Sequence, residues 1–145
     1  MLVAIQPFLK YADFTGRARR AEFWWFVLLV FVLEFVVSNA AFNYGLNPKI
    51  AVLVFWLAVL TPCFAVMARR LHDSDRSSRY LIIPFLFVAM LVFAVRVDGN
   101  GLPGMVLAVI ATASILILAA MGWFTILMLW PGTEGKNRYG VQSDV

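Results

Sequence analysis

The chain is organised around one polar stretch, Ala68-Arg69-Arg70-Leu71-His72-Asp73-Ser74-Asp75-Arg76-Ser77-Ser78-Arg79. This stretch holds the only histidine, four of the twelve basic residues and two of the eight acidic residues. One long apolar run precedes it and another follows it. Because apolar runs flank a short charged segment, we expect the stretch to connect two membrane-spanning helices.

The composition indicates the same class of protein. The 145 residues are 63% hydrophobic and 14% charged, and their mean hydropathy is +0.87. Soluble domains carry about a quarter charged residues, and a globule of this size must cover itself with polar surface. We therefore expect an all-α polytopic membrane protein that forms a single domain over residues 1–145.

The net charge of +4 comes from basic residues that flank the apolar runs. This placement favours contact with anionic lipid headgroups of the bilayer, and no nucleic-acid partner is expected. Cys63 is the only cysteine, so an intramolecular disulfide is excluded.

Four apolar runs predict four transmembrane helices, at about residues 23–42, 50–68, 80–97 and 105–130. A helix of about 20 residues, at ~1.5 Å per residue, covers the ~30 Å hydrocarbon core. Residues 1–14 are too short to span, and apolar residues at helical spacing around Pro7 predict an interfacial segment. An irregular tail is the alternative. No cleavable signal peptide is expected, and the first span is expected to act as an uncleaved anchor.

The basic residues predict the orientation. Ten of the twelve fall on the N-terminal segment, the 68–79 stretch and the tail, whereas Lys49 and Arg96 fall on the opposite side. Arg96 precedes the turn cluster Asp98-Gly99-Asn100-Gly101-Leu102-Pro103-Gly104. Since basic residues accumulate on the cytoplasmic side, both termini are expected to be cytoplasmic.

Three motifs carry a family resemblance: Tyr11-Ala12-Asp13-Phe14-Thr15-Gly16-Arg17-Ala18-Arg19-Arg20-Ala21-Glu22-Phe23-Trp24; then Pro62, Ala65-Val66, Arg69-Arg70-Leu71-His72-Asp73 and Arg76-Ser77; then Pro131-Gly132-Thr133-Glu134-Gly135-Lys136-Asn137-Arg138-Tyr139-Gly140. With these three motifs in this order, the chain resembles the small bacterial inner-membrane proteins of the domain of unknown function 805 family. The resemblance covers nearly the whole chain. It implies a multi-pass helical protein of the bacterial inner (plasma) membrane, with no established activity. Asp75 stands where the family usually has glycine, so the turn is expected to differ there.

The polar residues on the predicted cytoplasmic side are the candidate site. They are Arg17, Arg19, Arg20, Arg69, Arg70, His72, Asp73, Arg76, Asn137 and Arg138. The leading interpretation is a hub that ties the loops together, with Arg69 and Asp73 able to pair because they are four residues apart. The alternative is an arginine-rich concavity that binds a lipid phosphate or another anion.

Catalysis and metal binding are weaker interpretations of the same stretch. His72 and Asp73 are acid–base candidates, but adjacent residues of a helix point about 100° apart. One histidine without a nearby cysteine is a poor metal-ligand set. Ser74, Ser77 and Ser78 lack the glycine pattern of a nucleophile elbow. No enzyme activity, metal or cofactor is expected.

Glu34 lies inside the first apolar run. A charged carboxylate facing lipid is unfavourable, so we expect a hydrogen bond to Ser38, Asn39, Thr112 or Ser114, or to a partner. The alternative is an oligomeric channel or transporter that uses Glu34. The last run carries a mostly small-residue face that allows close helix packing: Ala108, Ala111, Thr112, Ile115, Ala119 and Gly122. The favoured function is a non-enzymatic accessory or assembly subunit, in a homo-oligomer or a larger membrane complex.

Overall fold

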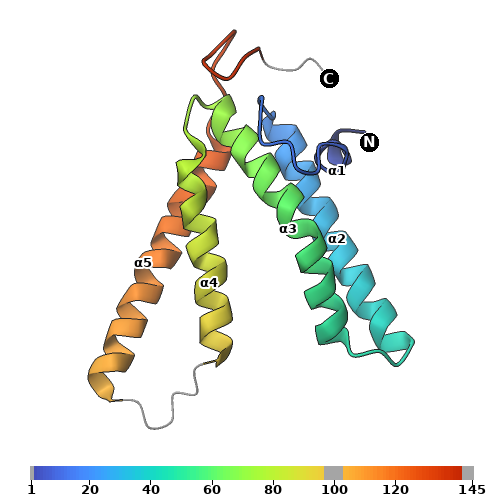
Figure 1. Ribbon diagram of the computed structural model, residues 1–145, viewed down its shortest axis with the longest axis vertical. Coiled ribbons are helices and arrows are strands. Elements are labelled where there is room, and N and C mark those ends of the chain that lie inside the picture. The colour runs from blue at the N-terminus through green and yellow to red at the C-terminus, as the bar shows by residue number, and fades with distance from the viewer. Residues whose placement is uncertain (1, 97–102, 142–145) are drawn as a thin grey trace. The chain divides into compact units, whose positions relative to one another are not determined.

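The computed structural model describes residues 2–96 and 103–141, and every regular element in this part of the chain is a helix (Figure 1). The predicted all-α class is confirmed for these residues. They form two compact units. One unit joins the chain up to Ser78 with the tail from Pro131, and the other comprises Arg79–Trp130.

The first unit is built on a hairpin of two long helices, α2 (Arg20–Asn43) and α3 (Pro48–Asp73), which lie side by side and antiparallel (Figure 1). Asn47 starts α3, because its side-chain oxygen accepts a hydrogen bond from the Lys49 amide at 3.0 Å. The α3 helix continues past residue 68, where the predicted span ends, to Asp73. The first half of the polar stretch is therefore helical.

The N-terminal segment packs on this hairpin. It forms a 3-10 turn, η1 (Leu2–Ala4), and a short helix, α1 (Gln6–Leu9). Pro7 lies in the first turn of α1, where its missing N–H is tolerated. The Phe8 ring meets the Phe26 ring of α2 edge-on, with centroids 5.1 Å apart. The Tyr11 hydroxyl donates to the Ala58 carbonyl of α3, so the segment is ordered and is not an irregular tail.

The second unit is a hairpin of α4 (Ile82–Arg96) and α5 (Gly104–Leu129), and the 3-10 turn η2 (Ser78–Leu81) leads into it. The rings of Tyr80 and Trp123 meet edge-on, with centroids 5.6 Å apart. Residues 97–102, which include the end of the third predicted span and most of the predicted turn cluster, lie outside the described residues.

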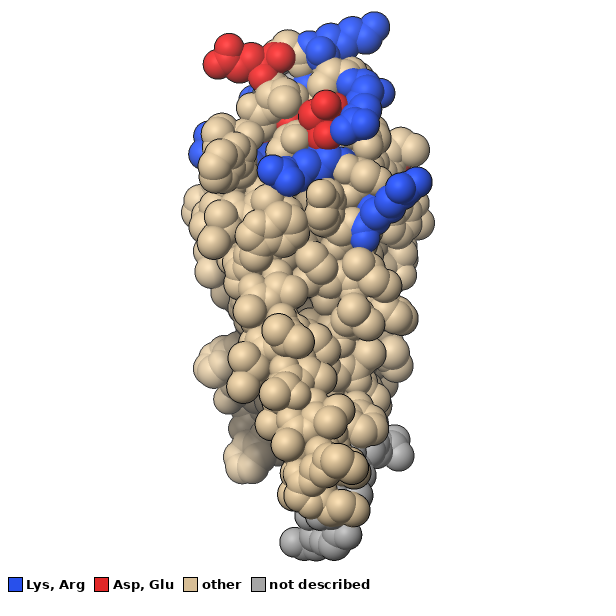
Figure 2. All heavy atoms as spheres, turned by 90° about the vertical axis from the view of Figure 1, so that its left-hand side faces the viewer, with Lys and Arg blue, Asp and Glu red and all other residues tan. Residues whose placement is uncertain are grey.

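Helix length agrees with a membrane protein. Among the described residues, α2, α3 and α5 are long and apolar enough to cross a membrane. At ~1.5 Å per residue, the 15 residues of α4 reach only about 22 Å of the ~30 Å core. On the face drawn in Figure 2, the charged side chains of the described residues gather toward one end. A multi-pass protein is therefore supported, while the count of four spans stays a prediction.

Candidate functional site

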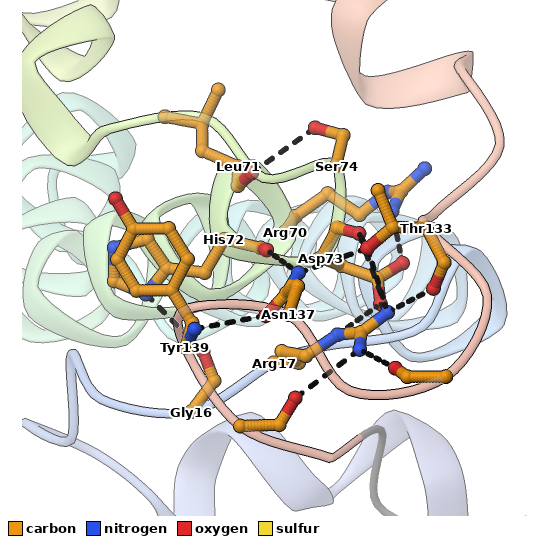
Figure 3. A network of polar contacts seen from close by, with 12 residues as sticks. Gly16, Arg17, Arg70, Leu71, His72, Asp73, Ser74, Thr133, Asn137 and Tyr139 are labelled. Carbon is orange, nitrogen blue, oxygen red and sulfur yellow. Dashed lines mark hydrogen bonds and ion pairs between the residues drawn. The ribbon is translucent and has the colours of Figure 1, made fainter.

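Segments far apart in the sequence meet at the end of α3 and form a network of polar contacts, here named the polar hub (Figure 3). Its members come from the start of the first unit, from the last turns of α3 and from the tail. They are Gly16, Arg17, Glu22, Arg69, Arg70, His72, Asp73, Thr133, Gly135, Asn137, Tyr139 and Gly140. All of them belong to the first unit.

Arg17 lies at the centre of the polar hub and is 3% exposed. Its Nε donates to Asp73 Oδ1 at 3.0 Å, and its Nη2 lies 3.0 Å from the same oxygen. Its Nη1 donates to the carbonyls of Gly135 at 2.5 Å and Gly140 at 3.3 Å, and its Nη2 donates to the Thr133 carbonyl. A planar guanidinium with five N–H donors suits this arrangement. One side chain thus binds both the helix end and the tail backbone.

Two buried carboxylates face the buried arginines. Arg70 Nη1 lies 2.6 Å from Asp73 Oδ2, so Asp73 has Arg17 on one oxygen and Arg70 on the other. Arg69 Nη1 lies 2.9 Å from Glu22 Oε1 of α2. The expected pair between Arg69 and Asp73 is therefore wrong, because Arg69 points to the neighbouring helix instead. Removing one partner from a buried pair costs about 3–5 kcal/mol.

The polar hub buries more positive than negative charge. Arg17, Arg69 and Arg70 are all buried, against Glu22 and Asp73, so three positive charges meet two negative ones. The Nε and Nη2 atoms of Arg69 are also shielded and have no hydrogen-bond partner among the described residues. Unpaired buried donors cost about 1–3 kcal/mol. The buried charges of the polar hub thus sum to one positive charge.

His72 connects all three segments. Its ring stacks on Tyr139, with centroids 3.9 Å apart and planes 4° from parallel. Its Nδ1 lies 3.1 Å from the Gly16 carbonyl oxygen, which can only accept, so Nδ1 carries the proton. Its Nε2 lies 2.7 Å from Ser78 Oγ, and in neutral imidazole it accepts from that hydroxyl. Both ring nitrogens are engaged, so acid–base chemistry at His72 would first require one of these bonds to break.

The tail caps the end of α3. A helix leaves its last four carbonyls without partners in the helix. The Thr133 amide donates to the Asp73 carbonyl at 2.8 Å, and Asn137 Nδ2 donates to the His72 carbonyl at 2.8 Å. Gly132 passes so close that a methyl group on its Cα would overlap the Asp73 carboxylate. Glycine is thus required there by space.

Arg138 and Asp75 lie at the exposed margin. Arg138 Nε donates to Asp75 Oδ1 at 2.9 Å, and its guanidinium lies over the Tyr139 ring, 5.4 Å from the centroid. Asp75 has a φ of 55°, in the left-handed region that glycine adopts without strain. Asp75 thus adopts a φ that glycine, the residue usual at this position in the family, would adopt without strain. The expected difference in the turn stays a prediction.

The other predicted site residues are more peripheral. Arg19 precedes α2 as its N-cap, half-buried, and Arg20 is the exposed first residue of that helix. Arg76 is half-buried in the turn after α3, where its amide donates to the Leu71 carbonyl at 2.9 Å. The structure thus brings together six of the ten predicted residues and leaves the others at the margin; the six are Arg17, Arg69, Arg70, His72, Asp73 and Asn137.

The loop before α2 has its own turn. The Thr15 hydroxyl donates to Asp13 Oδ1 at 2.6 Å and the Thr15 amide donates to it at 2.9 Å. These bonds favour the charged carboxylate and lower the pKa of Asp13 below its usual value. Gly16 follows with a φ of 75°, and the chain then enters the polar hub.

Glu34 lies half-buried in α2, without a hydrogen bond or ion pair to the described residues of the first unit. Three of its expected partners bond within their own helices. Asn39 donates to the Phe35 carbonyl, and the hydroxyls of Thr112 and Ser114 donate to carbonyls one turn earlier. Within the first unit, the expected bond from Glu34 to Ser38 or Asn39 is therefore not found among the described residues, and a bond to Thr112 or Ser114 of the second unit stays a prediction. Within the same residues, no group of His, Cys, Asp and Glu could hold a metal ion.

Six members of the polar hub are absent from the predicted site. Gly16, Gly135 and Gly140 contribute backbone carbonyls, and the other three are Glu22, Thr133 and Tyr139. Glu22 offered a signal, because it follows the arginine cluster at the first turn of a helix, where a carboxylate is favoured. Tyr139 offered only its position among turn-forming residues. Its stacking on His72 depends on the path of the tail, which local pattern does not determine.

The fold and the site define a class: a helical membrane protein whose N-terminal loop, second long helix and tail interlock through buried arginines. The chain belongs to the family described as "Protein of unknown function (DUF805)", whose model matches residues 11–141. The match includes all three segments of the polar hub.

Curated relatives agree with this assignment. Inner membrane protein YhaI of Escherichia coli (strain K12) is 34% identical over 96 residues, which are 66% of this chain and 81% of the relative. Inner membrane protein YhaH of the same strain is 33% identical over 100 residues, 66% of this chain and 83% of the relative. Uncharacterized protein YiiR is 33% identical over 131 residues, 88% and 84% of the two chains. No solved structure matches.

Proposed function

We propose that the chain is a non-enzymatic accessory or assembly subunit of the inner membrane, with four spans and both termini in the cytoplasm. The names of the relatives YhaI and YhaH support a location in the inner membrane. The polar hub supports a structural role for its arginines, because Arg17 uses its whole donor fork on neighbouring protein groups. Arginines that bind a substrate would instead keep donors turned toward an open cleft.

The third of these spans in chain order is η2 and α4 together. These two elements contain 4 and 15 residues and follow each other without a break. At ~2.0 Å per residue in the 3-10 turn and ~1.5 Å in the helix, they reach about 30 Å, the thickness of the hydrocarbon core. The excess of basic residues on the side of the termini supports a cytoplasmic polar hub. A cytoplasm-active reporter fused to the C-terminus is expected to be active, and a silent reporter at normal expression would contradict this orientation.

The observation that carries the accessory role is the outer face of α5. Ala111, Ala119 and Gly122 are exposed on one side of this helix, and nothing lies within 4 Å of a Cβ placed on Gly122. Ile117 and Phe124, on the opposite side, are half-buried or buried. Small residues let helices in lipid approach closely, so this face suits a helix of another membrane protein or of a second copy.

Large side chains placed on this face of α5 test the accessory role. Ala119→Leu combined with Gly122→Leu is expected to abolish capture of the partner when native membranes are crosslinked and the tagged chain is purified. Ala113→Leu is the control, since Ala113 is exposed and about 120° round the helix from Ala119. If wild-type protein runs alone after crosslinking, or if both variants lose the partner equally, the accessory role is wrong.

A further inference from the structure

A shallow groove lies on the outer side of α2, at the end where the helix begins. Its volume is about 320 Å³, and it is lined by Arg20, Ala21, Trp24, Trp25 and Leu28. The buried residues of the same turns, Glu22, Phe23 and Phe26, point to the other side of the helix. The groove therefore faces away from the core of the first unit.

The lining changes from charged to apolar along the helix axis. Arg20, Trp24 and Leu28 are spaced four residues apart, so they follow one another on a single face. The rise from the first to the third is about 12 Å at ~1.5 Å per residue. A leaflet changes from phosphate to hydrocarbon over a comparable depth, because its headgroup region is about 5–8 Å thick. Tryptophan rings favour the boundary between the two.

Two residues that line the groove carry a group without a hydrogen-bond partner among the described residues. Arg20 is exposed and has no hydrogen bond or ion pair with the described residues. The indole Nε1 of Trp24 is shielded from solvent and has no hydrogen-bond acceptor among them. An N–H without an acceptor in apolar surroundings is unfavourable, so an oxygen-bearing ligand would stabilise this side chain.

The charge around the groove selects an anion. The lining contains one arginine and no acidic residue, and the nearby polar hub buries three arginines against two carboxylates. The positive charge of Arg20 also acts on Arg70 of that hub. An anionic phosphate at the mouth of the groove would reduce this repulsion.

We propose that the groove binds an anionic phospholipid. Its phosphate contacts Arg20 and its acyl chain lies along Leu28. The Trp24 ring turns toward the groove, so that the buried Nε1 donates to an oxygen of the headgroup or ester region. This site is distinct from the polar hub, whose buried arginines each pair with a carboxylate of the protein. It does not depend on the accessory role, since it lies on α2 and the proposed contact face lies on α5.

The test counts lipids retained by the purified full-length protein in native mass spectrometry, after exchange into bilayers of equal parts phosphatidylglycerol and phosphatidylcholine. Wild-type protein is expected to retain phosphatidylglycerol preferentially. Arg20→Gln is expected to weaken retention about fivefold, the effect of one basic residue at an anionic surface. Arg20→Lys should restore most of it. Trp24→Phe, which keeps a ring and removes the N–H, should also weaken it.

Lys136→Gln is the matched control, because it removes one exposed positive charge from the tail and lies outside the groove. Equal retention of the two lipids by wild-type protein overturns the proposal, as does an equal loss for Lys136→Gln and Arg20→Gln. A further arm adds inorganic phosphate in pure phosphatidylcholine. If inorganic phosphate binds there and phosphatidylglycerol does not displace it, the ligand is a free anion and the phospholipid proposal is wrong. Thermal melts of each variant in detergent separate lost binding from lost folding.

Discussion

Replacing Arg17 with lysine tests whether the polar hub depends on the shape of the guanidinium or only on its charge. Lysine keeps a positive charge near Asp73 but has one nitrogen in place of three. It cannot reproduce the bonds to the tail carbonyls of Thr133 and Gly135 together with the contact to Asp73. A hydrogen bond from a charged group contributes about 1.5–3 kcal/mol. Two lost bonds therefore predict that the free energy of unfolding falls by at least about 3 kcal/mol.

The matched control is Arg138→Lys, because Arg138 forms an exposed ion pair with Asp75, the two side chains being 63% and 42% exposed. Exposed pairs contribute at most about 1 kcal/mol. Unfolding is followed by tryptophan fluorescence in mixed micelles of increasing denaturing detergent. Trypsin cleavage after Lys136 reports release of the tail, and it should accelerate in Arg17→Lys. If the free energy of unfolding of Arg17→Lys lies within about 1 kcal/mol of wild type and its tail is cleaved at the wild-type rate, the polar hub does not depend on the shape of the guanidinium.

Three further substitutions test other parts of the structure. Gly132→Ala should lower the free energy of unfolding by about 1–3 kcal/mol in the same titration, because its methyl displaces the buried Asp73 carboxylate; unchanged stability would contradict that contact. Asp75→Gly should stay within about 1 kcal/mol of wild type, since relief of the left-handed φ offsets the lost exposed pair with Arg138; a loss above about 2 kcal/mol would show that the pair matters more than the backbone. Glu34→Gln should leave proton flux into protein-containing liposomes unchanged, whereas a selective loss of flux would favour the channel hypothesis over the accessory role.

The membrane helices were predictable because the hydrocarbon core imposes length and composition on each of them. The predicted spans at 23–42 and 105–130 lie within a few residues of α2 and α5. The end of α3 was not predictable in the same way. Residues 69–73 are too polar to read as a span, yet they stay helical because the tail caps their carbonyls and other segments pair with their side chains.

The members of the candidate site were easier to predict than their partners. Charge and position in the sequence identify Arg69 and Arg70 equally well as candidate site residues. Because neighbouring residues of a helix point in different directions, Arg69 pairs with Glu22 and Arg70 pairs with Asp73. The i,i+4 rule describes neighbours on an isolated helix. It cannot anticipate that another segment brings Arg17 to the same carboxylate.

The arrangement of Asp73 explains why three distant segments form one structural unit. A carboxylate buried with one arginine would leave oxygen lone pairs unsatisfied, and a buried pair gains stability only when further hydrogen bonds complete it. Here Arg70 comes from the same helix, and Arg17 comes from the N-terminal loop. Arg17 in turn would bury unpaired donors if the tail did not supply carbonyls. Each segment thus completes the hydrogen bonding of the other two. Loss of any one should release the tail and the N-terminal loop together, so both are expected to become protease-sensitive in the same variants.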